Sequence, residues 1–183
     1  ARGPRYRLDA ELIRDLMLKA SGKLSPKMYG PSVYPPQPAS VTAVAYGATK
    51  WNVSKGEDRY RRSLYTFSKR TAPFAAFTTF DASSGEGCIA RRNRSNTPLQ
   101  ALTLLNDFMF VELAQHLALE AEKLVLDKRI EFLFRKFLTR PPTSKEASLM
   151  NQYLETQRQR FGKGELKASQ IMGQKNATAE QAA

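Results

Sequence analysis

The chain has few of the side chains on which metal and covalent chemistry usually depend. Its 183 residues include one cysteine, Cys88, and one histidine, His116. A single cysteine excludes an internal disulfide and a cysteine-based zinc site built from this chain alone, and a single histidine excludes the paired-histidine zinc motif. There is no Cys-x-x-Cys-His haem-attachment sequence. We therefore expect this chain to hold no covalent haem and no metal.

Long apolar runs and acidic residues are also scarce. No apolar run is long enough to cross a bilayer, and the first residues do not resemble a signal peptide. Only 17 Asp and Glu stand against 29 Lys and Arg, which gives a formal net charge of +12. Such a surplus predicts affinity for nucleic acid, anionic lipid or acidic glycans. Many basic domains are charged only for solubility, so binding requires that the cations gather on one face.

Hydrophobic periodicity predicts a mainly α protein with an irregular N-terminal half. Residues 1–161 are expected to form a single partial domain: a helix within 1–23, irregular structure with short strands over 24–95, and a helical bundle over 96–161. Five prolines between Pro26 and Pro38 exclude a helix there, and short strands are expected at 41–46 and 61–69. Residues 162–183 lack a pattern and are expected to be a disordered tail.

Capping residues place the helices of the C-terminal half. Thr97, Pro98 and Gln100 fit the N-cap, first position and capping-box partner of one helix, and Thr143 to Glu146 forms a second capping box. Asn106-Asp107 provides an N-cap for a helix to Val125.

Candidate functional residues are most frequent between Gly56 and Asp107, where arginines alternate with aromatic residues. Three arginines precede the helix that starts at Thr97, and the N–H groups of a helix N-terminus favour anions. The anion-binding surface that we predict comprises Arg61, Arg62, Lys69, Arg91, Arg92, Arg94, Asn96 and Thr97.

The same stretch contains four acids with two possible roles. One is to pair with the arginines as structural salt bridges, which suits the guanidinium fork. The other is to supply the two carboxyl groups of a glycosidase, with Asp81 or Glu86 in the site. These acids are Glu57, Asp58, Asp81 and Glu86.

Two further hypotheses have weaker support. A nucleophile set of Cys88, His116 and Asp81 lacks any recognised motif around the cysteine, so no catalytic residue is predicted. Basic residues among Tyr60, Tyr65 and Phe67 resemble a single-strand nucleic-acid platform, yet no RNA-recognition or helix-turn-helix pattern is present.

Several blocks, in this order and spacing, carry a family resemblance. From about Arg5 to Phe161 the chain resembles the C-terminal domain of unknown function in planctomycete-type, cytochrome-c-associated multidomain proteins. It differs from that pattern at Ser68, at Ser83 and at Phe108, where the family often has a proline after the aspartate. Without that proline, residues 98–125 are also compatible with one kinked helix. The blocks are Gly30 to Pro38, Gly56 to Phe67, Lys69 to Pro73, Thr79 to Ala82, Cys88, Arg91-Arg92 and Asn96 to Asp107.

The resemblance implies a periplasmic or secreted bacterial setting. It implies that haem belongs to a separate N-terminal domain, and that partners are other domains of the same polypeptide, with anionic glycan as a ligand suited to the charge. It also implies that this chain is a fragment truncated at both ends. No catalytic residues are established for the family. We therefore expect a structural or ligand-binding module, with a polysaccharide-acting enzyme or a nucleic-acid-binding domain as alternatives.

Overall fold

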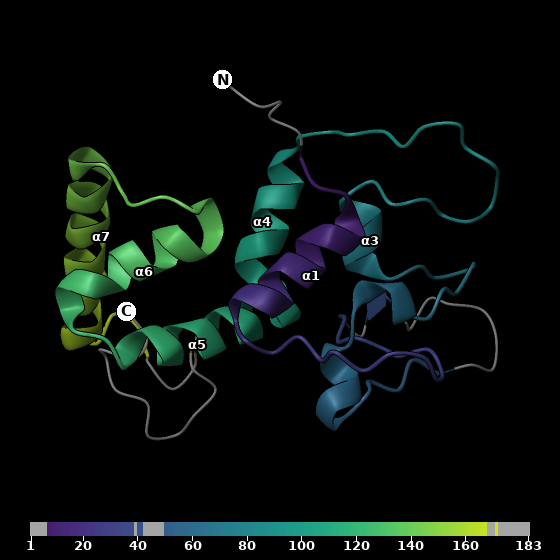
Figure 1. Cartoon of the computed structure of the whole chain (residues 1–183), viewed down its shortest axis with the longest axis horizontal. Coiled ribbons are helices and arrows are strands. Elements are labelled where there is room, and N and C mark those ends of the chain that lie inside the picture. Colours follow the sequence, from purple (N-terminus) through teal and green to yellow (C-terminus); the bar gives the residue numbers. More distant parts are fainter. Residues whose placement is uncertain (1–6, 39, 42–49, 168–170, 172–183) are drawn as a thin grey trace. The chain divides into compact units, whose positions relative to one another are not determined.

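The computed structural model describes residues 7–38, 40–41, 50–167 and 171, and this part of the chain is mainly helical, as predicted (Figure 1). It forms two compact units, residues 1–114 and 115–183. The helices of the first unit are α1 (Ala10–Ala20), α3 (Ala75–Thr79), α4 (Pro98–Asn106) and the start of α5 (Phe108–Glu122), with 3-10 turns η1 (Gly56–Tyr60) and η2 (Ser63–Tyr65). The second contains the rest of α5, α6 (Leu126–Leu138) and α7 (Ser144–Gly162).

The core of the first unit forms where α1 packs against η2 and α3. Ala10, Arg14 and Leu18, four residues apart, lie on one buried face of α1, and the helix expected within residues 1–23 is confirmed. The buried members of this core are Ala10, Leu18, Phe74, Ala76, Phe80, Met109, Phe110 and Leu113.

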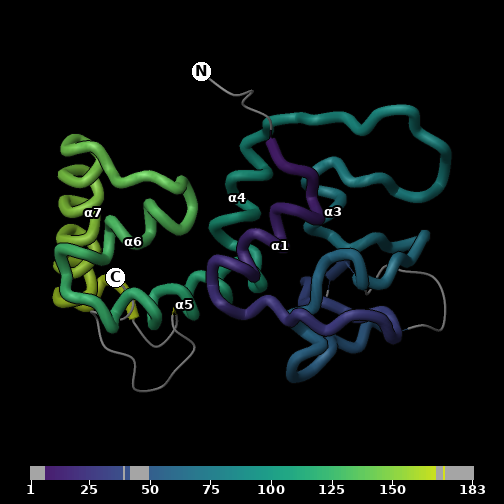
Figure 2. The backbone as a smooth tube through the Cα atoms, in the orientation of Figure 1, coloured from purple at the N-terminus to yellow at the C-terminus, as the bar shows by residue number. Residues whose placement is uncertain are grey.

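Residues 21–38 and 50–72 wind through the first unit with little regular structure (Figure 2). The strand expected at 61–69 does not form, because its pairing is limited to single bridges, Ser25 with Arg61 and Val33 with Thr66. Between the bridges η2 turns the chain. The strand expected at 41–46 lies almost wholly outside the described residues.

Two buried arginines join segments of the irregular chain by hydrogen bonds to backbone carbonyls, as strand pairing does in a sheet. Arg14 of α1 is 1% exposed and donates to the carbonyls of Arg61 at 2.7 Å and Arg59 at 3.1 Å, and to Ser63 Oγ at 3.3 Å. Arg61 is fully buried and donates to the carbonyls of Pro31, at 2.9 Å, and Tyr29. Each guanidinium thus gathers carbonyls from chain segments that lack ladder partners.

An aromatic cluster fills the space between the proline-rich segment and α3. Trp51 stacks on Phe74 with ring centroids 6.0 Å apart, and lies 6.5 Å from Phe67. Phe74 meets Phe77 edge to face at 5.0 Å, and Tyr34 lies 4.9 Å from Phe67. Phe74 and Phe80, which flank α3, are therefore buried in the core, and Phe77 of α3 packs against it.

Residues 98–125 form two helices and not one kinked helix. Thr97 and Gln100 make the predicted capping box of α4. Asp107 is extended, and its carboxylate accepts from the N–H of Met109 at 2.9 Å, so it caps α5. In the second unit the capping box of Thr143 and Glu146 starts α7, again as predicted. None of the helices in the described part is long and apolar enough to span a membrane.

Candidate functional site

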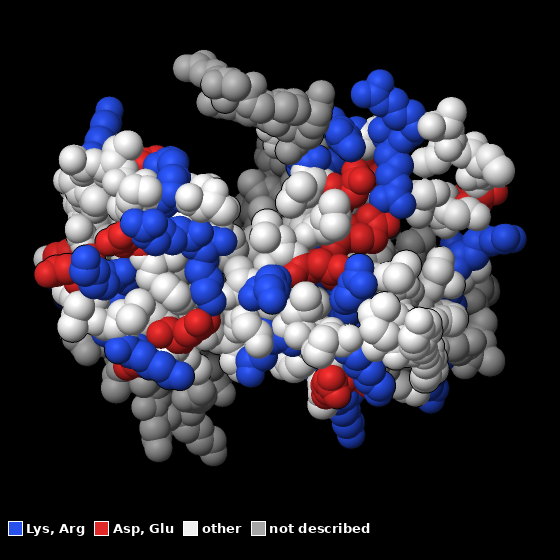
Figure 3. Space-filling model, viewed as in Figure 1, with Lys and Arg blue, Asp and Glu red and all other residues white. Residues whose placement is uncertain are grey.

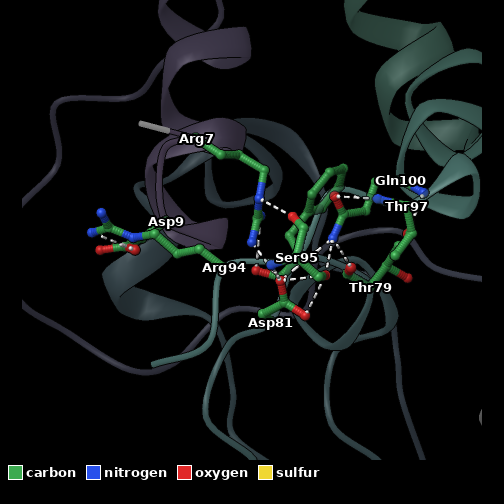
Figure 4. Close-up of polar contacts among 9 residues, drawn as sticks. Arg7, Asp9, Thr79, Asp81, Arg94, Ser95, Thr97 and Gln100 are labelled. Carbon is green, nitrogen blue, oxygen red and sulfur yellow. Dashed lines mark hydrogen bonds and ion pairs between the residues drawn. The ribbon is translucent and has the colours of Figure 1, made fainter. Parts of the chain in front are cut away.

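The polar cluster at the start of α4 is the place where the sequence predicted an anion site. Figure 4 shows that the side chain at its centre is Asp81, which follows α3. Its carboxylate accepts from the Ser95 N–H at 2.7 Å and from Ser95 Oγ at 2.7 Å. Arg7 donates to the same carboxylate at 2.5 Å. The chain therefore supplies its own anion here.

Gln100 closes this cluster from within α4. Its side chain is buried, and Nε2 donates to the Thr79 carbonyl at 3.1 Å and to Ser95 Oγ at 3.0 Å. We call Arg7, Asp81, Ser95 and Gln100 the latch, because they join the two ends of the long loop between α3 and α4 (Figure 4). The Ser95 hydroxyl and N–H, with the Arg7 charge, hold the pKa of Asp81 below its usual range.

Arg92 and Arg94 bind α1 and its lead-in. Arg92 forms a bidentate pair with Glu11, at 2.7 and 3.0 Å, and Arg94 lies 3.6 Å from the carboxylate of Asp9. Asp9 stands at the N-cap position of α1, but its side chain makes no capping hydrogen bond. Two of the three predicted arginines therefore converge on α1 as salt bridges, the alternative that the sequence left open.

The other cations of the predicted surface are dispersed. Arg61 is buried, Arg62 and Arg91 are exposed, and Lys69 is half-buried, while Asn96 and Thr97 are exposed beside α4. Basic and acidic side chains are interleaved on the face of the first unit shown in Figure 3. That face therefore carries no continuous basic field.

The four predicted acids do not form a catalytic pair. Glu57 accepts from Ser25 Oγ at 2.6 Å, Asp58 pairs with Lys27 at 2.9 Å, and Glu86 is exposed in the long loop. Asp81 is held ionised by its hydrogen bonds, whereas a general acid needs a raised pKa.

Asp107 has the opposite shift. Burial raises its pKa, and it lines a shallow depression with residues of α3 and α4, where it is the sole acid. Its carboxylate is already used as the cap of α5. This depression therefore lacks the second carboxyl group that glycoside hydrolysis requires.

One exposed aromatic residue, Tyr29, was not singled out from the sequence, and its backbone binds Arg61. Tyr29 is 80% exposed and has φ 61°, a left-handed conformation that is unusual for an aromatic residue. Its N–H donates to the hydroxyl of Tyr65 at 2.8 Å, and its carbonyl accepts from Arg61. Arg61 in turn lies 3.9 Å from the centre of the Tyr65 ring. The backbone of this exposed tyrosine is thus held in a strained conformation by the buried Arg61 and the half-buried Tyr65.

We call the exposed residues Met28, Tyr29 and Arg62 the Tyr29 ledge. The Met28 sulfur lies 4.0 Å from the Arg62 guanidinium and 3.9 Å from the Tyr65 hydroxyl. The same hydroxyl accepts from the Tyr29 N–H, so Met28 and Tyr65 connect Arg62 to the backbone of Tyr29. Arg62 has no carboxylate partner among the described residues. The only advance signal was local: glycine follows Tyr29 in a proline-rich segment, which marks a turn but not the exposed ring.

Metal and nucleophile chemistry finds no support in the described residues. They contain no cluster of three or more His, Cys, Asp or Glu side chains that could hold an ion. Cys88 is exposed in the long loop, and Asp81 is committed to the latch.

Comparison with known proteins gives one match. The family model described as "PSD1: Protein of unknown function (DUF1553)" matches residues 1–154. Searches of curated proteins and of solved structures find no match.

Proposed function

Because the chain belongs to the PSD1 (DUF1553) family of proteins of unknown function, we propose that it is a non-catalytic structural or ligand-binding module of a larger extracytoplasmic bacterial protein. The setting that we propose is a planctomycete-type, periplasmic or secreted, cytochrome-c-associated polypeptide. In it, haem is carried by a separate N-terminal domain, and this module contacts the other domains of the same polypeptide. The ligand that we propose is an anionic polysaccharide.

The observation that carries the ligand proposal is the Tyr29 ledge. The backbone of Tyr29 is held by Tyr65 and Arg61, and a tyrosine side chain has only two torsions to fix on binding. Its exposed ring face is suited to stack on the C–H face of a sugar ring. Arg62, which contacts the adjacent residue Met28, can bind a carboxylate or sulfate through two parallel hydrogen bonds. An exposed aromatic ring and an exposed guanidinium on one ledge therefore fit a sugar that carries a negative charge.

The ledge is less suited to nucleic acid. Single-strand platforms use several aromatic side chains for successive bases, along a groove of positive charge. The ledge offers one exposed ring, Tyr29, because Tyr65 lies beneath Arg61 and is half-buried. The interleaved charges of Figure 3 likewise provide no long basic track on that face.

Replacing Arg62 with alanine is expected to weaken binding of a sulfated or uronate-bearing polysaccharide about tenfold, since a hydrogen-bonded charge contributes roughly 1.5 kcal/mol or more. Calorimetry with dextran sulfate, polygalacturonate and neutral dextran measures this, and neutral dextran should bind most weakly. Arg70→Ala is the matched control, because Arg70 is an exposed arginine of the same unit outside the ledge. Equal losses in both variants would mean that net charge alone attracts the polymer and would contradict a site at the ledge.

Replacing Tyr29 with glycine should separate binding from folding. Glycine adopts a positive φ without strain, so the free energy of unfolding should stay level or rise by up to about 1 kcal/mol. The same variant should bind dextran sulfate more weakly, because the ring is gone. Urea denaturation and calorimetry on one preparation test both effects. A marked loss of stability would show that the tyrosine is a packing residue, and unchanged binding would exclude stacking.

A further inference from the structure

A small cleft in the first unit is lined by aromatic rings and hydroxyl groups that do not belong to the Tyr29 ledge. Its volume is about 230 Å³, and its walls come from α1, the segment 63–68, α3 with the two residues before it, and the start of the long loop. These segments are far apart in sequence and meet only in the folded chain. The cleft is smaller than the roughly 300–1,000 Å³ of sites for drug-sized ligands, so it suits a single small ring.

Three aromatic rings form one part of the cleft lining. They belong to Phe67, Phe74 and Phe77, which are also members of the aromatic cluster. Phe74 is buried, and the other two are half-buried. Because the cluster fixes these rings from behind, they present an ordered apolar surface to anything that enters the cleft.

Hydroxyl groups form much of the remaining lining. Ser68 and Ser83 are exposed at the cleft and join Thr66, Thr78 and Ser84 in its wall. Thr66 Oγ1 is buried and has no hydrogen-bond partner among the described residues. An unpaired buried hydroxyl is costly, and this one lies within the wall. The exposed hydroxyls of Ser68 and Ser83 are the ones that can exchange hydrogen bonds with a ligand.

The charge of the lining is close to neutral. Its one charged side chain is Glu11, whose carboxylate is already bound by Arg92 at 2.7 and 3.0 Å. No lysine or arginine lines the cleft, so it offers an anionic group no counter-charge. A carboxylate placed beside Glu11 would be repelled.

From these features we infer that the cleft is a binding subsite for one neutral sugar ring. A pyranose has an apolar face for the phenylalanines and a rim of hydroxyls for the serine and threonine oxygens and the free lone pairs of Glu11. A wholly apolar ring would leave the hydroxyls of the wall unpaired, and an anion would find no partner. This site goes beyond the proposed binding of anionic polysaccharide at the Tyr29 ledge.

The only tryptophan of the chain provides a direct test. Trp51 stacks on Phe74 and contacts Phe67, both of which line the cleft, so a ligand resting on these rings should change its fluorescence. Titration with the methyl glycosides of glucose, galactose and rhamnose should give a saturable change with a dissociation constant on the order of 1 mM. Glucuronate should bind more weakly than methyl glucoside.

Ser68→Leu blocks the cleft and should abolish the fluorescence change. Ser68 is exposed, so the fold should survive, and far-UV circular dichroism checks this. Ser148→Leu is the matched control, because Ser148 is exposed on α7. Absence of a response to all three glycosides, an equal response in Ser68→Leu, or tighter binding of glucuronate would each overturn the inference.

The two binding proposals can fail separately. Arg62→Ala and Tyr29→Gly should leave the response to neutral glycosides intact, because neither residue lines the cleft. Ser68→Leu should leave dextran sulfate binding intact. If the neutral-ring response is lost in Arg62→Ala, it arises at the ledge, and a separate subsite in the cleft is wrong.

Discussion

Replacing Arg14 with alanine is expected to lower the free energy of unfolding by about 3–5 kcal/mol. The substitution removes the donors that satisfy the carbonyls of Arg59 and Arg61 and the hydroxyl of Ser63, and it leaves a cavity under α1. Each buried acceptor left without a partner costs roughly 1–3 kcal/mol. No strand is available to take over these groups, so the irregular segment would lose its attachment to α1.

An opposing effect makes the loss of stability in Arg14→Ala smaller than the summed costs of the unpaired acceptors and the cavity. Arg14 is 1% exposed, its nearest carboxylate is Asp15 at 4.0 Å, and burial lowers its pKa to about 10. At neutral pH the guanidinium is still charged, so alanine also relieves the cost of burying that charge. We expect the unpaired carbonyls and the cavity to outweigh the relief, because three acceptors depend on this one side chain.

Two variants separate these contributions in urea denaturation. Arg14→Met restores most of the volume without the donors, so it should recover the cavity part of the loss and leave the hydrogen-bond part. Arg135→Ala is the matched control: this arginine is exposed and pairs with Glu131 one turn away on α6, a contact worth about 0.5 kcal/mol or less. If Arg14→Met were as stable as the parent, relief of the buried charge would outweigh the lost hydrogen bonds. The proposal that Arg14 stabilises the irregular segment through those bonds would then be wrong.

Replacing Asp81 with alanine is expected to lower the free energy of unfolding by about 2 kcal/mol at neutral pH. The variant leaves the Ser95 N–H and the Arg7 guanidinium without their acceptor. The side chain retains 22% of its exposure, so water compensates in part and the loss should be smaller than at Arg14. Protection of the Ser95 amide from hydrogen exchange should fall sharply, because this bond joins the ends of the long loop.

The latch should also make stability depend on pH in the acidic range. The folded-state pKa of Asp81 lies below its unfolded value, so its contribution is fully present above the ordinary carboxyl value near 4 and disappears as the pH falls through the lowered value. The difference in stability between the parent and Asp81→Asn should therefore shrink on acidification. A constant difference down to strongly acidic pH would show that the charge of Asp81 is not what matters.

These two residues had different standing in the sequence: Asp81 was one of four acids with a structural or a catalytic role, and Arg14 was not singled out. Arg61, Arg92 and Arg94 are committed to carbonyls or carboxylates of the chain itself. The groups that face solvent at the ledge, Tyr29 and Arg62, and the hydroxyls of the cleft remain available to a ligand. The binding proposals therefore rest on these exposed groups and not on the arginine count.

Local patterns by themselves determined the helices. Capping boxes at Thr97 and Thr143, the apolar stripe of α1 and the prolines before Pro38 act within a few residues, so their consequences could be predicted from the sequence. The single cysteine and single histidine likewise ruled out cysteine-based zinc sites and the paired-histidine zinc motif. Alternation of side chains over 61–69 was misleading, since a strand requires a partner strand and only two isolated bridges form there.

Only the tertiary structure decided which charges meet and which remain free. Asp81 and Arg7 are 74 residues apart in the chain, Arg92 and Glu11 are 81 apart, and Arg14 reaches the carbonyl of Arg61 across 47 residues. An arginine in a sequence has the same appearance whether it binds a ligand, a carboxylate or a backbone carbonyl. Which of these it does depends on what folding brings within about 3 Å of it, and no local pattern specifies that.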